Sequence, residues 1–234
     1  KKLLKNKKVM IGIVVVLVLA LIGGASYMLL SGDDGKSNII KKKDKESSKK
    51  LNLVSLDSKS RPYAVMINNI STARPLQSGL QDAYLMYEII VEGGITRYLA
   101  VFVDTNTERI GSIRSARHYF IDYALENDAF YVHHGQSPQA QEDFSKLGVD
   151  RIVVDNSKTG WRDKSLKVAS EHTLFTSMDK LKNGINKRRV ERKKDYLLNY
   201  SVDEVDLSKK ENSKPANNVK IVYSNSSTTS YTYN

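Results

Sequence analysis

The first 30 residues divide into a short charged segment and a long apolar one. Residues 1–8 contain five lysines and no acidic residue, whereas residues 9–30 form a run of 22 residues without a charge. As a helix, this run would span about 33 Å, which matches the hydrocarbon core of a bilayer. The pattern predicts one transmembrane helix at residues 9–30, with residues 1–8 in the cytoplasm and the rest of the chain outside the cell membrane.

Two other interpretations of the apolar run are open. One is a buried core helix, but core helices are rarely apolar on all sides over such a length. The other is a signal peptide cleaved near Gly23-Gly24-Ala25, where small residues suit a signal peptidase. The run continues through Leu30, which favours a retained anchor.

Residues 31–60 show neither helical nor strand periodicity. They contain many charges and no aromatic residue, and this composition predicts a flexible linker. Its lysines either remain solvated or lie against anionic lipid beside the anchor.

Apolar and polar positions become periodic from residue 61 onward. Short apolar runs bounded by turn residues predict strands at residues 63–67, 84–91, 96–103, 129–134 and 151–154. The second and third strands would form a hairpin through Glu92-Gly93-Gly94. Helical spacing predicts helices at residues 115–125 and 137–147. This mixture makes residues 61–180 an α+β domain.

The chain beyond residue 180 is predominantly basic. Residues 181–214 form a basic helical or linker segment, with helix expected in parts of residues 177–200. The dense basic run at residues 187–194 either binds an anionic envelope polymer or lipid headgroups, or is a solvated surface. A strand at residues 219–223 predicts that residues 215–234 begin a C-terminal β part that is cut short.

Composition and charge exclude several classes of function. There is no cysteine, which excludes disulfides, thiolate nucleophiles and cysteine-ligated metals. The net charge of +11 does not come from the domain, because residues 61–179 carry 12 Arg or Lys against 15 Asp or Glu. A mildly acidic domain argues against a nucleic-acid partner.

Two arginines provide the main candidate for chemistry. Arg114 and Arg117 lie at the start of the predicted helix 115–125, where cations oppose the helix dipole. A bound anion, held by free N–H groups and two guanidinium groups, would resolve the conflict. The alternative is that both arginines pair with Glu88 and Glu92 inside the domain, since Glu88 interrupts an apolar strand.

No motif predicts a metal or a cofactor. His133 and His134 end a predicted strand, where ligands often bind, but neighbours on a strand point to opposite faces and cannot easily share a metal. Ser137 lies in a segment that resembles a nucleophile elbow, yet Pro138 has no N–H to donate to an oxyanion. We interpret Ser137 as a helix cap instead. We expect no cofactor and no metal, and catalytic residues stay unassigned.

Several ordered blocks of residues resemble the YerB-like family of Gram-positive bacteria. They are spread in order across residues 61–180: Arg61-Pro62, Val65–Asn69, Ala73–Pro75, Gln77–Leu80, Tyr87-Glu88, Val91–Arg97, Ser112–Arg117, Tyr131–His133, Ser137–Ala140 and His172–Ser177. The resemblance implies an extracytoplasmic protein, often a lipoprotein, with a layered α+β fold of sheets covered by helices. This chain lacks the lipidation cysteine, so the helix at residues 9–30 would replace the lipid as anchor.

These observations lead to one main functional hypothesis. We expect a membrane-anchored binding or scaffold protein of the cell envelope that recognises an anionic component or a partner protein. Its candidate ligand-binding residues are Arg114, Arg117, Glu88, Glu92, His133 and Asn68.

Two other hypotheses are open. One is an envelope-modifying hydrolase or transferase, with acid–base groups from His133, His172, Glu88 and Glu92; it requires at least two of these to lie within hydrogen-bond reach. The other is a structural partner of wall-synthesis or division proteins, in which the anchor and the basic run at residues 187–194 matter most.

Overall fold

The computed structural model describes residues 54–203 and 205–233. The predicted transmembrane helix at residues 9–30 and most of the predicted linker lie outside these residues, so both stay predictions. Among the described helices, none has the length and apolar character needed to cross a membrane.

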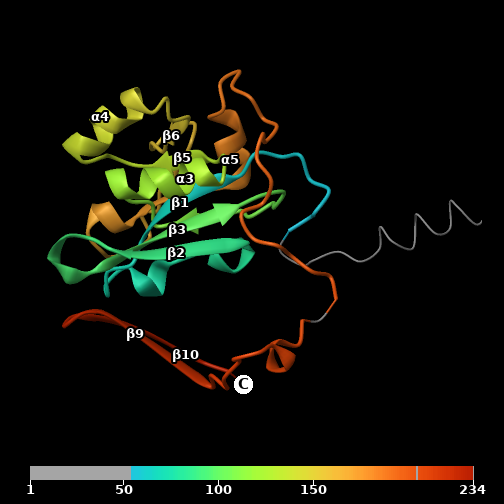
Figure 1. Cartoon of the computed structure of the whole chain (residues 1–234). Coiled ribbons are helices and arrows are strands. Elements are labelled where there is room, and N and C mark those ends of the chain that lie inside the picture. Colours follow the sequence, from blue (N-terminus) through green and yellow to red (C-terminus); the bar gives the residue numbers. More distant parts are fainter. Residues whose placement is uncertain (1–53, 204, 234) are drawn as a thin grey trace, which may run out of the picture. The chain divides into compact units, whose positions relative to one another are not determined.

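A five-stranded mixed sheet forms the centre of the domain (Figure 1). The strand order is β2-β3-β1-β5-β6. Strands β1, β5 and β6 are parallel, while β3 runs antiparallel to both β1 and β2. The bounds are Tyr63–Asn68 for β1, Leu85–Ile90 for β2, Thr96–Phe102 for β3, Phe130–His133 for β5 and Arg151–Val153 for β6.

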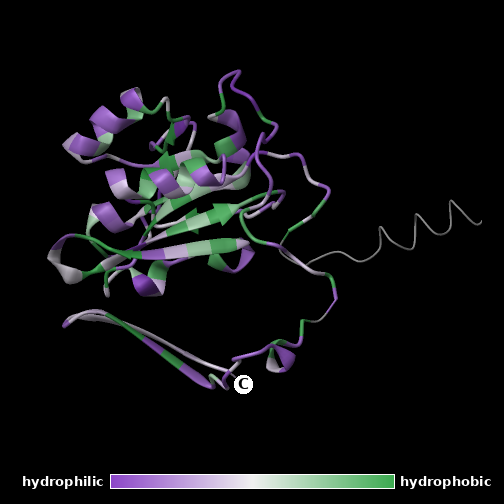
Figure 2. Ribbon diagram, viewed as in Figure 1, coloured by the Kyte–Doolittle hydropathy of each residue, from purple (hydrophilic) through white to green (hydrophobic). Residues whose placement is uncertain are grey.

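Alternating side chains of the sheet enter two separate hydrophobic cores. In β1, Ala64 and Met66 belong to one core, whereas Tyr63, Val65 and Ile67 belong to the other. This alternation follows from the two-residue period of a strand. Because both faces are covered, all six residues of β1 are buried, and the strand interiors form the hydrophobic centre of the ribbon in Figure 2.

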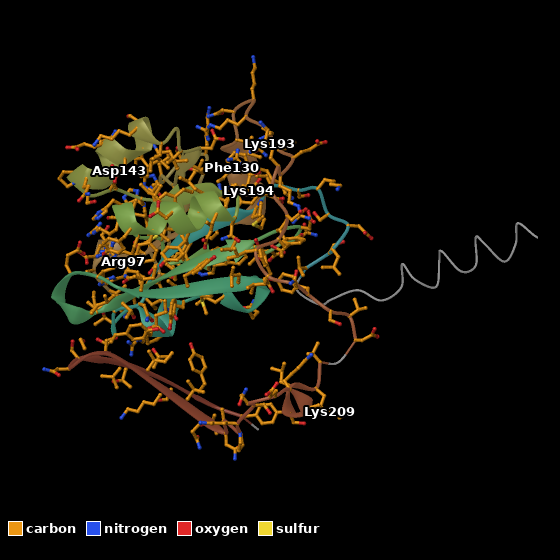
Figure 3. The ribbon with its side chains drawn as sticks, viewed as in Figure 1. Arg97, Phe130, Asp143, Lys193, Lys194 and Lys209 are labelled. Atoms are coloured by element: carbon orange, nitrogen blue, oxygen red, sulfur yellow. The ribbon has the colours of Figure 1, made fainter. Side chains whose placement is uncertain are left out.

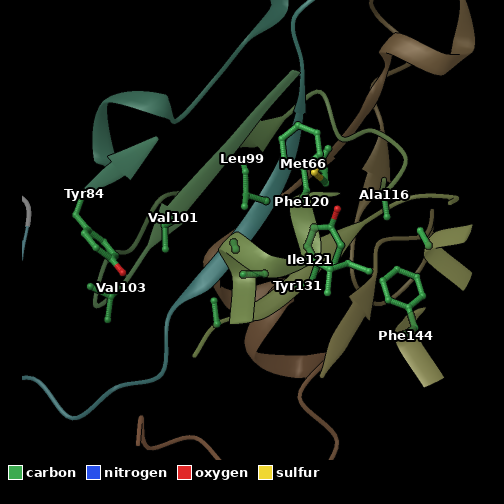
Figure 4. Packing of buried hydrophobic residues seen from close by; sticks show 14 of the residues in the cluster. Met66, Tyr84, Leu99, Val101, Val103, Ala116, Phe120, Ile121, Tyr131 and Phe144 are labelled. Carbon is green, nitrogen blue, oxygen red and sulfur yellow. The ribbon is translucent and has the colours of Figure 1, made fainter. Parts of the chain in front are cut away.

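Two helices cover the first face of the sheet, α3 (Ile121–Glu126) and α4 (Pro138–Lys146). They pack Ile121 and Phe144 against the strands, as Figure 4 shows. The Ser137 hydroxyl accepts a hydrogen bond from the N–H of Ala140 at 3.2 Å. This cap confirms the predicted start of the second helix.

The second face is covered by a small three-stranded sheet and a short helix. Its strands, in the order β4-β8-β7, are Ile110–Gly111, Leu174–Thr176 and Trp161–Arg162. The helix, α5, spans Met178–Asn183. Strands of two or three residues leave no periodic signal, so the sequence did not predict this sheet.

The C-terminal residues form a hairpin of β9 (Asn218–Ser224) and β10 (Ser227–Thr232). Only β9 was predicted, because the Ser- and Thr-rich β10 has no apolar run. The hairpin contacts the domain through Thr229, whose hydroxyl donates to Glu88 at 2.9 Å, and through Ser224, which donates to the carbonyl of Gly94 at 2.5 Å. The short 3₁₀ helices are η2 (Arg74–Leu76), η3 (Leu80–Asp82), η4 (Glu92–Gly94), η5 (His118–Phe120), η6 (Ser170–His172) and η7 (Leu207–Lys209).

Two predicted helices are wrong over part of their length. The helix expected at residues 115–125 begins only at η5 and α3, because residues 112–116 hydrogen-bond to strand β1 and to the segment that follows β5. The expected helix in residues 177–200 is confined to α5.

The basic run at residues 187–194 is partly held by acidic residues of the domain. Asp128 receives Arg189 Nη2 at 2.6 Å and the Lys193 N–H at 2.6 Å. Asp128 lies just before β5, at the amino end of the parallel strands. Figure 3 accordingly shows Lys193 well away from Arg97, which is the second residue of β3. Part of the run therefore has a structural role, while its other lysines remain at the surface.

Candidate anion-binding site

The candidate site lies where the central parallel strands separate. β1 and β5 pair over Tyr63–Val65 and Phe130–Val132. Beyond this point the segment Ser112–Ala116 lies between them. Arg114 N–H donates to the carbonyl of Met66 at 3.0 Å, and the Arg114 carbonyl accepts from the N–H of His134 at 3.1 Å. The carboxyl ends of parallel strands are a common place for ligands in such sheets.

The expectation that free N–H groups of a helix start would hold an anion here is wrong, because these N–H groups already donate hydrogen bonds within the domain. The Arg114 N–H is used by β1, and the Ala116 N–H donates to the carbonyl of Gly135 at 2.9 Å. Neither amide belongs to a free helix N-terminus. Any anion bound at this end of the parallel strands must therefore be held mainly by side chains.

Three arginines gather at this end of the parallel strands, and Arg97 is the most buried of them. Arg97 pairs with Asn68 in the β3–β1 register, so it enters from the strand beside β1. It is 6% exposed, and its Nη1 donates to the carbonyl of Ser115 at 2.7 Å. Within residues 54–203 and 205–233, no carboxylate lies within ion-pair distance of Arg97. Burial, together with the charges of Arg117 and Arg114, lowers the pKa of Arg97 to about 10.

The other two arginines have carboxylate partners on the exposed rim. Arg117 Nε donates to Glu92 Oε1 at 2.5 Å, as the sequence suggested, and this bond is the main reason that the pKa of Glu92 lies below its usual value. Arg114 Nη2 reaches Glu171 Oε1 only at 3.4 Å, and its buried Nε has no hydrogen-bond partner in the described structure. The two glutamate side chains are 62% and 58% exposed, so both can be displaced.

Asn68 and His172 form a buried polar pair at the same end of the sheet, where β1 ends. Asn68 Nδ2 lies 2.9 Å from His172 Nδ1. An amide nitrogen can only donate, so we assign Nδ1 as the acceptor and place the ring proton on Nε2. His172 Nε2 then faces Glu171 Oε1 at 3.8 Å. The pair links the end of β1 to the carboxylate that meets Arg114.

His133 and Ser112 are buried polar groups without a full set of partners. His133 Nδ1 lies 2.8 Å from the carbonyl of Gly135, which can only accept, so Nδ1 carries the proton. The opposite nitrogen, Nε2, and the Ser112 hydroxyl are buried and have no partner among the residues described. His133 also stacks on Phe144 at 5.1 Å between ring centroids. Burial lowers the pKa of His133 to about 4, so the ring is neutral at physiological pH.

Glu88 does not belong to this cluster, and its predicted pairing with the arginines is wrong. Its carboxylate accepts from Thr96 at 2.7 Å, from Asn69 at 3.2 Å and from Thr229 at 2.9 Å. The reason is strand parity: Tyr87 and Ile89 face the first core, so Glu88 faces the other side of the sheet.

The arrangement suits anion binding better than acid–base catalysis. Within the part of the chain that the structure describes, His133, His172, Glu88 and Glu92 make no hydrogen bond to one another. Within residues 54–203 and 205–233 there is also no group of three or more acidic or histidine side chains that could hold a metal ion. Sequence reasoning missed Arg97, although a charged residue beginning the apolar strand Thr96–Phe102 was a usable signal.

The fold is that of a mixed α+β domain, and its candidate site is lined by arginines at the carboxyl ends of the parallel strands. The chain belongs to the family described as protein of unknown function (DUF3048), N-terminal domain, whose model matches residues 52–191. Together with the two relatives described next, this match confirms the YerB-like resemblance.

A curated relative and a solved structure that are similar to this chain are both YerB of Bacillus subtilis. The chain is 34% identical over 174 residues to a candidate lipoprotein of that name from strain 168, a match that covers 72% of this chain and 50% of the relative. The crystal structure of YerB matches with a TM-score of 0.60 at 32% identity, over 75% of this chain and 58% of that one. The chain thus spans about half the length of the relative, and the mixed α+β fold is shared.

Proposed function

We propose that this protein is an extracytoplasmic, membrane-anchored binding protein whose domain holds a carboxylate or phosphate group between Arg97, Arg114 and Arg117. The observation that carries the proposal is the burial of Arg97 without a carboxylate partner in the described residues. A buried charge without a carboxylate in ion-pair contact is costly, and an anionic ligand in contact with Arg97 would offset that cost.

The charges around the site support this proposal. Among residues 54–203 and 205–233, the cluster of three guanidinium groups has two carboxylates in ion-pair contact, Glu171 with Arg114 and Glu92 with Arg117, and both are largely exposed. A ligand oxygen can therefore replace either glutamate with little loss of stability. The free Arg114 Nε adds an unused donor.

The extracytoplasmic location rests on two arguments. The lysines at residues 1–8 and the apolar run at residues 9–30 predict this orientation. The relative YerB carries the name of a candidate lipoprotein, a class that is held at the outer side of the cell membrane. An anionic component of the envelope is then the accessible ligand class.

The test is thermal unfolding of the full chain with inorganic phosphate, acetate, teichoic acid fragments and peptidoglycan fragments. A ligand at 100 times its dissociation constant should stabilise the fold by about 2.7 kcal/mol. The stabilisation should be lost in the double variant Arg114→Ala/Arg117→Ala. A double variant of two exposed lysines with the same charge change, Lys146→Ala/Lys182→Ala, should retain it.

Two results would contradict the proposal. One is the absence of stabilisation by every anion in the panel. The other is an equal loss of stabilisation in both double variants, which would indicate a non-specific charge effect. If the arginine double variant does not fold, the single variant Arg114→Gln gives the same comparison, because the Arg114 side chain lies on the rim and makes only long contacts.

A further inference from the structure

Strand β2 is an edge strand with unpaired backbone groups. The N–H of Val91 donates to the carbonyl of Ile95 at 2.7 Å, and the register continues through Ile89 and Arg97. Because the groups of an antiparallel strand alternate, those of Met86, Glu88 and Ile90 turn away from β3. They make no backbone hydrogen bond to another strand in the residues that the structure describes. Such an edge can accept an added strand.

An apolar groove lies beside the last residues of β2 and the turn that follows it. It has a volume of about 450 Å³ and is lined by Ile89, Ile90, Val91, Glu92, Tyr119 and Tyr123. Ile89 and Val91 face the first core on the groove side, whereas the Ile90 side chain, 43% exposed, faces the other side of the sheet. The hairpin β9–β10 contributes no lining residue, so the groove is open to a ligand.

The groove ends at the arginine cluster. Glu92 lines the groove and also receives Arg117 Nε. Tyr119, on the opposite wall, lies close enough to Arg117 and Arg97 to be influenced by their charges. An apolar surface, a free strand edge and a surplus positive charge therefore meet at one place.

We propose that this groove binds the extended C-terminus of a peptide. The peptide adds to β2 as a new strand and places an apolar last side chain between Ile89 and Tyr123, which pack on the same face of the sheet. Its α-carboxylate replaces Glu92 at Arg117. It runs parallel to β2, since its carboxyl end must reach Arg117 beside the last residues of that strand. This inference rests on the proposed anion site and names its partner.

The free strand edge favours a peptide over a lipid phosphate. A hydrocarbon chain would fill the groove but would leave the outward N–H and C=O groups of β2 unused. A peptide backbone uses them and supplies a single carboxylate at its end. One negative charge also matches the surplus of one guanidinium over the two glutamates of the cluster.

The experiment is affinity selection by the immobilised full chain from two hexapeptide pools. Both pools have randomised positions followed by Val, Ile, Leu or Phe at the C-terminus, and one pool is amidated. Free-acid peptides should be retained at least about tenfold better than amides, because hydrogen bonds to a charged group contribute about that much. Equal retention of the two pools, or none by either, would overturn the inference.

A matched pair of variants tests the groove itself. Ile90→Glu places a carboxylate on β2 beside the added strand and its terminal carboxylate, and should weaken binding of selected peptides by about tenfold or more. Val153→Glu makes the same exposed substitution on β6, at the opposite edge of the sheet, and should leave binding unchanged. Equal effects of both variants, or no effect of Ile90→Glu, would overturn the inference.

Further arms separate this inference from the proposed function. If inorganic phosphate stabilises the chain through the arginines while no peptide is retained, the anion site stands and the peptide inference fails. The peptide inference also fails if vesicles containing phosphatidic acid bind through the groove in place of peptides. If no anion and no peptide binds, both proposals fail.

Discussion

Replacing the carboxylate of Asp128 should weaken the whole domain, because this side chain joins three parts of the chain. Its oxygens receive Arg189 Nη2 at 2.6 Å, Arg189 Nη1 at 2.9 Å and the Lys193 N–H at 2.6 Å. Arg61, only 5% exposed at its side chain, lies 3.5 Å away and also donates to the Asp128 carbonyl. The variant Asp128→Asn removes the charge and tolerates the left-handed backbone at this position, where φ is +52°.

The expected loss follows from burial and from the remaining partners. Removing one partner of a buried ion pair costs about 3–5 kcal/mol. Here Arg61 keeps Asp150, at 2.5 Å, and Arg189 is 30% exposed, so the cost is smaller. We expect a loss of about 2–3 kcal/mol, which lowers Tm by roughly 5–10 °C in a domain of this size.

The pH dependence provides a second readout. Burial alone would raise the pKa of Asp128, but hydrogen bonds from Arg189 and Lys193 and the charge of Arg61 outweigh it and hold the pKa below its usual value. A lowered pKa contributes stability that is present above the unfolded pKa, about 3.9, and is lost as pH falls through the folded pKa. The native chain should therefore lose stability more steeply than Asp128→Asn below about pH 4.

Urea unfolding monitored by circular dichroism measures both effects. The control is Asp122→Asn, an exposed acid in the first turn of α3, which should change stability by less than about 0.5 kcal/mol. A double-mutant cycle of Asp128→Asn with Arg189→Gln should show a coupling energy of about 1 kcal/mol or more. A loss no larger than that of the control, or zero coupling, would refute the assignment of Asp128 as an anchor for residues 188–193.

Two further predictions concern the candidate site. His133 should remain neutral down to about pH 5, because burial lowers its pKa to about 4; its contribution to stability is complete above about pH 6.5 and declines as pH falls toward 4. An NMR titration of the ring carbons would contradict this if His133 titrated near pH 6.5. Glu92→Gln removes the carboxylate that competes for Arg117, so anion affinity should rise by up to about fivefold. Calorimetric titration showing unchanged or weaker binding would contradict the idea that Glu92 occupies the ligand's place.

Local signals were sufficient for the elements that their own residues determine. Ser137-Pro138 predicted the start of α4, and the apolar runs with the Glu92–Gly94 turn predicted the β2–β3 hairpin; both are confirmed. The helix predicted at residues 115–125 rested on the helical spacing of Ala116, Phe120 and Ala124. Its first part is not helical, because tertiary hydrogen bonds hold residues 112–116 to β1 and to the segment that follows β5. Tertiary contacts override such a weak local preference.

The candidate site was partly predictable for a similar reason. Sequence reasoning included the pairing of Arg117 with Glu92 among its alternatives, and the structure shows this pair. The exclusion of Glu88 depends on strand parity, which was not fixed until the first core was known. Arg97 joined the cluster because Asn68 lies opposite it in the β1–β3 register, and no sequence pattern specifies that register.

The insertion of Ser112–Ala116 between β1 and β5 has a kinetic consequence. The backbone around Arg114 is held from both sides, by Met66 and by His134, like that of a central strand. A ligand arriving at this arginine has no loop to order, so little conformational entropy is lost on association. Encounter should then proceed at the ordinary rate for preformed sites, and ligands that differ in affinity should differ mainly in how long they stay bound.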